Sequence, residues 1–599
     1  MQPFFAFFDR PFTRIVCTGI LLVLAIVAFG NMSAHLFEGD DFEYVKEIAA
    51  ARQNLSQLFS HERTLPGRPA VDLVFFIIHA IGGEHPAPFH IAVVCLHLLA
   101  AMLLSHTFQK LGADRELSLL STGLFLVNVA SFRAVHWIAC LAYPLSLLFS
   151  LITIMAFLHH LRNNSTGWLA LATGALGLSI LSHMAAAWVV GLCMYLVYQH
   201  RKNFRDMARS IAPLWFVTLI LGLWVYHLSS SAPQAEHAAV LSAQIHIGDS
   251  LTKWIWFAGR LFTTPFVLGT DLTEMQTADW IVGIGFVVVA GTMAFKAPRP
   301  VVFWIVWTLL LLTAFIFNPH QTWLAGGPSR YLYLPSAGAA LLIVWSLRAI
   351  CQRFPNGRIP KLLFGCVYSA ILIVNILSIK RAEAITYYLS GRGYIARSDW
   401  ETGMDQIAHA IRHDASIIPL DAYRRYAMGC LGLGQSPDKL VALAPAEKRA
   451  DPIVQLYLDL SMYIENAQTA WADIDANIKQ NYEQTHDKIE YQKNAALAYN
   501  NLATHYYYES QFDKSRHLYR KAVEWRPDYQ LSLERLLLTY YAQGKYQEAA
   551  RALQIIIDAK SIDQRALKSL GLMLYHTGHR EEALQVHRFL SEQSKKTER

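Results

Sequence analysis

The sequence predicts an all-α protein with two parts, a polytopic membrane helix bundle followed by an α-solenoid of tetratricopeptide repeats. One observation is composition: 54% of the 599 residues are hydrophobic and only 16% are charged, whereas ordinary soluble domains have roughly 25% charged residues. Another is a 34-residue repeat near the C-terminus, which is the period of this repeat family. We expect the membrane part at residues 1–380 and the repeat part at 381–599.

The charges divide between the two parts. Residues 381–599 contain 28 basic and 28 acidic side chains, so the net charge of +7 belongs to residues 1–380. In a membrane protein such an excess indicates topology, and it gives no reason to expect a nucleic-acid partner. The seven cysteines show no paired spacing, which predicts neither a disulfide framework nor a cysteine metal site.

Eleven apolar runs approach the length of about 20 residues that a helix needs to cross a bilayer. The basic loops, including those at Arg10, Lys110 and Arg201, all fall on one side, which the positive-inside rule makes cytoplasmic. The outer face then holds the first loop, residues 32–87, together with the repeats. Apolar stretches at 70–81 and 251–269 are expected in the outer interface. The expected spans lie near residues 13–31, 88–108, 117–136, 141–159, 167–182, 184–199, 211–228, 279–295, 301–317, 332–349 and 361–379.

The expected spans offer no chain of intramembrane carboxylates. Residues 117–205 and 280–382 contain no acidic side chain. Ion-coupled carriers use such groups inside the membrane. The sequence therefore disfavours a proton-driven transporter.

The repeats begin at Ser510, Gly544 and Gly578, each followed by a similar short motif. A degenerate copy at Ser398 predicts that the array begins near residue 390, and the clear repeats cover 495–593. Arrays of this kind stack helix hairpins into a superhelix whose concave face holds peptides, so we expect a peptide or protein partner there.

The best catalytic candidates are Asp40 and Asp41, which follow the first span together with Glu38. A carboxylate there can act as a general base toward a hydroxyl. The competing interpretation is that the Gly-Asp-Asp sequence only forms a turn. The residues alone leave open which aspartate, if either, is the base.

Other polar groups gather at the outer ends of the expected spans. An arginine holds a phosphate by charge-assisted hydrogen bonds, so carboxylates and arginines on one face suit sugar transfer from a lipid phosphate. The arginines also fit interface anchors, and the histidines fit helix packing. Outer histidines such as His35 and His61 lack ligand spacing, so no metal site is assigned, while a divalent cation as cofactor stays open. The donor-phosphate candidates are Arg330, Arg68 and Arg133, and the substrate-binding candidates are Glu38, His90, His136 and Tyr331.

The order of these motifs resembles a known family. After the acidic pair come GRPAVDLVFFIIHAIGG, PAPFHIAVVCLHLLAAMLL, FRAVHWI, SRYLYLPSAGAALL and then the repeats. This order resembles the transmembrane and tetratricopeptide-repeat O-mannosyltransferases and their bacterial relatives, polytopic glycosyltransferases of fold type C. The resemblance implies an inverting transferase with a polyprenyl-phosphate sugar donor, Asp40 or Asp41 as base, Arg330 near the donor phosphate, and the repeats near a protein or glycan acceptor.

Two stretches depart from that family. Where relatives continue with a Gly-Arg-x-Asp type sequence, this chain has the uncharged residues 139–144, and His183 with Met184 replaces a Lys-Glu pair. These departures favour a second function, a non-catalytic membrane-anchored scaffold for envelope glycan or protein assembly. A third possible function is that of a ligase with a lipid-diphosphate donor. Such a ligase should have an outer loop rich in arginine and histidine, yet the 228–280 loop contains only two Lys or Arg residues, Lys253 and Arg260. We expect a bacterial inner membrane with the N-terminus cytoplasmic and periplasmic repeats, or an endoplasmic reticulum membrane with lumenal repeats.

Overall fold

The computed structural model describes residues 11–60, 63, 67–201, 203–230, 247–315, 327–353, 358–465, 471–545 and 578–597, with isolated residues between 548 and 575. Arg10 and His61 lie outside the described residues. The described part contains α- and 3-10 helices and no strand, which confirms the all-α prediction. It divides into two compact units, residues 1–418 and 419–599.

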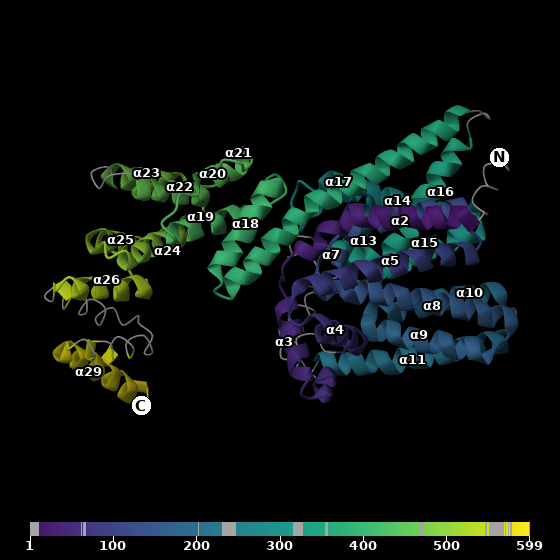
Figure 1. The fold of residues 1–599 in the computed structure, drawn as a ribbon, viewed down its shortest axis with the longest axis horizontal. Coiled ribbons are helices and arrows are strands. Elements are labelled where there is room, and N and C mark those ends of the chain that lie inside the picture. The colour runs from purple at the N-terminus through teal and green to yellow at the C-terminus, as the bar shows by residue number, and fades with distance from the viewer. Residues whose placement is uncertain are drawn as a thin grey trace. The chain divides into compact units, whose positions relative to one another are not determined.

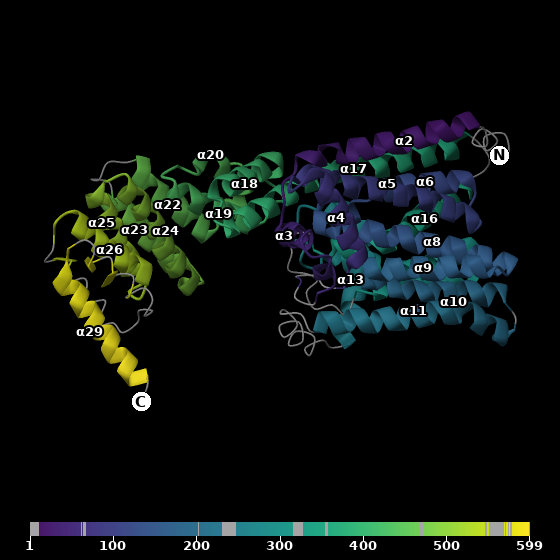
Figure 2. The ribbon, with the colours of Figure 1, turned by 60° about the horizontal axis from the view of Figure 1, so that its bottom comes forward.

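The first unit is a bundle of long apolar helices. Figures 1 and 2 both show α2, α5, α8 and α9 running roughly parallel, with α3 and α4 at one end. The α-helices of this unit are α2 (Pro11–Phe29), α3 (Asp41–Ala51), α4 (Pro69–Gly82), α5 (Pro86–Lys110), α6 (Arg115–Leu126), α7 (Arg133–His136), α8 (Ala142–Asn163), α9 (Thr166–Ser182), α10 (Val189–His200), α11 (Phe204–Ser230), α13 (Ile247–Val267), α14 (Thr277–Lys296), α15 (Arg299–Thr313), α16 (Tyr333–Cys351), α17 (Arg358–Ala396) and α18 (Trp400–Asp414).

Six helices within the described residues are long and apolar enough to cross a membrane. They fall on α5, α8, α11, α14, α16 and α17, all of which contain expected spans. The expected spans at 13–31, 167–182, 184–199 and 301–317 correspond to shorter apolar helices. The length and composition of these helices make the first unit a multi-pass membrane bundle.

The expected span at 117–136 is not one helix. α6 ends at Leu126 and is followed by the short helices η4 (Val129–Ser131) and α7. The break has a local cause, because the side chain of Asn128 accepts the N–H of Ala130 at 2.9 Å and Asn375 accepts the N–H of Val129 at 3.1 Å. Side-chain caps of this kind compete with helical hydrogen bonds, and after the break residues 129–141 form short helical turns that are buried in the bundle.

The expected boundary at residue 380 falls inside α17, the 39-residue helix that Figure 1 shows extending from the bundle. α18 packs on its C-terminal half, where a Cβ at Gly403 would lie 2.9 Å from the carbonyl oxygen of Gly391. Glycine is required at such a close helix contact. This hairpin is the degenerate repeat copy at Ser398, and it belongs to the first unit.

The second unit contains the remaining helices. Ser398, Ser510, Gly544 and Gly578, which open the four repeat motifs, all have positive φ, between 58° and 89°. A left-handed residue suits the tight turn between two helices of a repeat. The helices of the second unit are α19 (Leu420–Gly432), α20 (Asp438–Val441), α21 (Ala446–Arg449), α22 (Pro452–Glu465), α23 (Trp471–Gln484), α24 (Lys488–Tyr508), α25 (Phe512–Trp525), α26 (Gln530–Ala542) and α29 (Arg580–Thr597).

Candidate functional site

The acidic pair lies on a tight turn between η2 (Gly30–Ala34) and α3. Gly39 has φ of 49°, a left-handed conformation that glycine adopts at little cost. A Cβ there would also lie 3.3 Å from the ring of Trp137. The turn therefore places Asp40 just before α3 and Asp41 as its first residue.

Asp41 is fully buried and bonded on both oxygens. Its Oδ1 accepts the N–H of Ala139 at 2.7 Å, and its Oδ2 accepts the N–H of Glu38 at 3.0 Å. Burial, followed by the charge of Glu38, raises the pKa of Asp41 well above its ordinary value. The Asp41 side chain ties the first loop to the segment between α7 and α8.

Asp40 differs from its neighbour. It is half-buried, it does not cap α3, and its side chain has no hydrogen bond or ion pair within the described residues. Burial raises the pKa of Asp40 above its ordinary value, while the charges of Arg330 and Arg68 oppose that rise. The site thus contains an unbonded carboxylate in the field of three arginines, Arg330, Arg68 and Arg397, and Arg397 is itself paired with Glu43.

Arg133 and Glu38 form a buried ion pair. Arg133 Nη1 lies 2.9 Å from Glu38 Oε1, and both side chains are at most 4% exposed. The Arg133 guanidinium also lies 5.1 Å from the centre of the Trp137 ring. Arg133 therefore pairs with the carboxylate of Glu38 and is not among the arginines that act on Asp40.

Arg330 occupies η7 (Ser329–Leu332), just before α16. Its Nη2 donates to the Tyr331 hydroxyl at 2.7 Å, and its guanidinium lies over the rings of Tyr331 and Trp137 at 4.8 and 5.1 Å. Within the described residues, neither Arg330 nor Arg68 forms an ion pair with a carboxylate. Arg330 therefore keeps N–H groups available, since a guanidinium has five donors.

The candidates His90 and His136 belong to a different cluster. Both rings contact the ring of His35, with centres 5.9 and 6.2 Å apart, and His35 stacks on Tyr387 at 4.7 Å. All three histidines are buried. No group of three or more His, Cys, Asp or Glu side chains among the described residues is arranged to hold a metal.

Sequence reasoning missed an aromatic layer beside Arg330. Tyr143 and His183, in the two stretches that depart from the family, have ring centres 4.5 Å apart. Phe315 connects His183 to Tyr331, with ring centres 5.7 and 5.1 Å apart. These rings come from four separate segments, so no spacing in the sequence could have grouped them.

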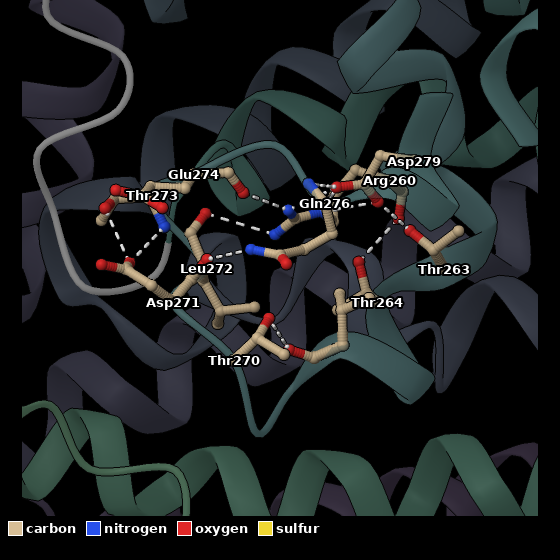
Figure 3. Close-up of polar contacts among 11 residues, drawn as sticks. Arg260, Thr263, Thr264, Thr270, Asp271, Leu272, Thr273, Glu274, Gln276 and Asp279 are labelled. Atoms are coloured by element: carbon tan, nitrogen blue, oxygen red, sulfur yellow. Dashed lines mark hydrogen bonds and ion pairs between the residues drawn. The ribbon is translucent and has the colours of Figure 1, made fainter. Parts of the chain in front are cut away.

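Arg260 belongs to the 228–280 loop expected from the sequence. It is buried, and its guanidinium bonds other groups of the protein, as Figure 3 shows. Its Nε lies 3.1 Å from both carboxylate oxygens of Asp279, and its Nη2 lies 2.6 Å from Oδ2. Nη1 and Nη2 also donate to the carbonyls of Leu272 and Glu274 at 3.2 and 2.8 Å. Arg260 therefore holds the segment between α13 and α14, and each of its three guanidinium nitrogens bonds a protein group.

Comparisons with known proteins identify the repeats and give remote structural similarities. The tetratricopeptide repeat family model matches residues 500–561 and 535–587, which confirms the repeats predicted near the C-terminus. No curated protein sequence matches the chain. The apo oligosaccharyltransferase of Archaeoglobus fulgidus is similar in structure, with 11% sequence identity and a TM-score of 0.42. The similarity covers 66% of this chain and 60% of the oligosaccharyltransferase, so this chain spans about three fifths of the length of that protein. ArnT from Cupriavidus metallidurans is similar in its undecaprenyl phosphate complex (15% identity, TM-score 0.34, covering 75% and 77%) and in its apo state (13%, 0.35, 70% and 79%).

Proposed function

We propose that this chain is an inverting membrane glycosyltransferase that transfers a sugar from a polyprenyl-phosphate donor to an acceptor hydroxyl on the outer face of the membrane. The observation that carries the proposal is the half-buried, unbonded carboxylate of Asp40 in the field of Arg330 and Arg68. The acceptor would be a protein or glycan hydroxyl, with a protein Ser or Thr hydroxyl favoured by the family resemblance, and the repeats would bind a peptide or protein partner. The proposed membrane is a bacterial inner membrane with the N-terminus cytoplasmic and the repeats periplasmic.

In this proposal Asp40 is the general base. Its carboxylate takes the proton of the acceptor hydroxyl while the acceptor oxygen attacks the anomeric carbon from the side opposite the phosphate. The bond between the anomeric carbon and the phosphate oxygen breaks, and its electron pair stays on the phosphate. The leaving polyprenyl phosphate gains one negative charge, which Arg330 and Arg68 stabilise.

The other candidates have supporting roles in this proposal. Asp41 and the Arg133–Glu38 pair hold the backbone around the turn, since their polar atoms contact protein groups. Tyr331 and Trp137 position Arg330 through a hydrogen bond and a cation–π contact. His90 and His136 lie in the separate histidine cluster, so we assign them no contact with the donor.

The test is genetic and chemical. The gene is deleted in the native host and restored as wild type, Asp40→Asn, Asp41→Asn or Glu43→Gln at matched membrane levels, and glycoproteins and envelope glycans are profiled by mass spectrometry. Glu43 is the control because it lies in the same turn of α3 and pairs with Arg397 at the surface, at 3.2 Å.

We expect one glycan to vanish on deletion and to return with wild type and Glu43→Gln but not with Asp40→Asn. Full restoration by Asp40→Asn would exclude Asp40 as the base. If deletion changes no glycan while envelope proteins are mislocalised, the scaffold function replaces the transferase.

A further inference from the structure

His183 lies between α9 and η6 (Met184–Trp188), at the outer end of an expected span. Its Nδ1 accepts the N–H of Ala185 at 3.1 Å and so caps η6. An accepting Nδ1 carries no proton, which puts the proton of the neutral ring on Nε2. The local fold therefore fixes His183 as an Nε2–H donor.

The ring of His183 is part of the aromatic layer that contains the partner of Arg330. It packs on Tyr143 and Phe315, and Phe315 packs on Tyr331, whose hydroxyl accepts the bond from Arg330. Tyr143, Phe315 and Tyr331 are each at most 4% exposed, whereas His183 is half-buried. Rigid neighbours hold the ring, and the residue as a whole keeps partial exposure.

Electrostatics keep this donor neutral. Burial, followed by the charges of Arg68 and Arg330, lowers the pKa of His183 well below its ordinary value. The charges of Arg68 and Arg330 act on both Asp40 and His183, and the contacts of Phe315 with both rings place His183 beside Tyr331, the partner of Arg330. A neutral N–H donor adds a hydrogen bond to an anion without adding a third positive charge beside two guanidinium groups.

We propose that His183 binds the donor phosphate through its Nε2–H, as the third member of a set with Arg68 and Arg330. This inference rests on the proposed transferase function and adds to it a residue that binds the phosphate of the donor. A sugar on a lipid monophosphate carries one negative charge, which becomes two when the sugar leaves, and this matches two arginines and a neutral donor. A lipid-diphosphate donor would leave with one charge more than the two arginines supply.

The test measures lipid binding and needs no acceptor or turnover. Purified full-length protein in nanodiscs is titrated with undecaprenyl phosphate, undecaprenyl diphosphate and uncharged undecaprenol. His183→Asn keeps a capping side chain but is too short to place a donor at the Nε2 position, and His183→Gln restores a donor near it. His160→Gln is the matched control, because His160 makes its contacts with Ser165 and Ser210 on the opposite side of the membrane.

We expect His183→Asn to weaken undecaprenyl phosphate binding about tenfold, the size of one hydrogen bond to a charged group. His183→Gln should recover most of the affinity, His160→Gln should bind as wild type, and the monophosphate should bind more tightly than the diphosphate. If Arg330→Gln weakens binding while folded His183→Asn and His183→Gln both bind as wild type, the role of His183 is refuted and the transferase proposal survives. If wild type binds undecaprenyl phosphate no better than undecaprenol, the proposed donor is wrong and this inference fails with it.

Discussion

Arg260 and Arg330 show how differently two arginines can be used in one bundle. Arg260 is 2% exposed and bonds Asp279 and two carbonyl groups with its three nitrogens. Arg330 is half-buried and donates one hydrogen bond, to Tyr331, within the described residues. A guanidinium that is buried with all three nitrogens bonded to protein groups is poorly placed to bind a ligand, whereas one held only by aromatic neighbours can bind an anion. The carboxylates repeat the contrast, with Asp41 saturated and Asp40 unbonded.

Substitution of Asp40 and of Asp41 should give the largest difference in effect between two neighbouring residues. We expect Asp40→Asn to lower turnover roughly 10²- to 10⁴-fold, the usual contribution of a general base, with little change in the melting temperature. Asp41→Asn should lower the free energy of unfolding by about 1–3 kcal/mol, because the amide leaves a buried N–H without its acceptor. Turnover and thermal unfolding of both purified variants in the same detergent check this. Equal losses of turnover per folded molecule would contradict the division of roles.

Substitution of the arginines extends the comparison. Arg330→Gln should reduce turnover about 10²- to 10³-fold, as expected when a donor to a developing anion is removed, and should leave the fold intact. Arg260→Gln should instead destabilise the first unit by about 3–5 kcal/mol, because Asp279 stays buried without its counter-charge. Activity and protein level are measured in purified membranes. Arg330→Gln should show low activity at a normal protein level, whereas Arg260→Gln should show a low protein level. A normal level of stable Arg260→Gln would show that the pair contributes little to stability.

The sequence predicts the fold well, because the apolar runs and the 34-residue period each repeat a strong local signal. It also groups Asp40, Arg68 and Arg330 in one expected set, and in the structure the charges of both arginines act on Asp40. It could not separate Asp40 from Asp41, since the distinction depends on a hydrogen bond to Ala139, 98 positions away. For the same reason it could not show that Arg133 pairs with Glu38 or that Arg260 pairs with Asp279. Charge and position are visible in a sequence, whereas the saturation of a charged group is a property of packing.

His183 shows a second limit of sequence reasoning, which concerns residues that depart from a family motif. Measured against the family pattern, His183 and the segment containing Tyr143 look like the loss of charged contacts. In the structure their rings contact each other beside the partner of Arg330. A departure from a motif can therefore mark a changed site as well as a lost one, and only the three-dimensional neighbours distinguish the two cases.

The turn at Gly39 should respond more weakly than the charged groups. Gly39→Ala puts a side chain at positive φ, at a cost of about 1–2 kcal/mol, and presses it on Trp137. We expect this contact to shift Asp40 and the ring under Arg330, with turnover falling about tenfold. Gly83→Ala is the control, since Gly83 has φ of 63° and open space around it. It should lose similar stability in thermal unfolding and keep full turnover, and equal turnover in both variants would mean that the Trp137 contact does not position the site.

The smallest effect concerns pH. A general base acts when deprotonated, so activity falls as the pH drops through the pKa of Asp40. Because burial raises that pKa, the acid limb of the rate profile should lie above the ordinary aspartate value of about 3.9. Arg68 lowers the pKa, so Arg68→Gln should move the limb to higher pH by up to about 1 unit, and by less at high salt because Asp40 is only half-buried. Lys253→Gln removes a charge of the 228–280 loop that is not among those acting on Asp40 and should leave the limb in place. An acid limb that does not move in Arg68→Gln would mean that another group titrates, and the carboxylate in the field of the arginines would then not be the base.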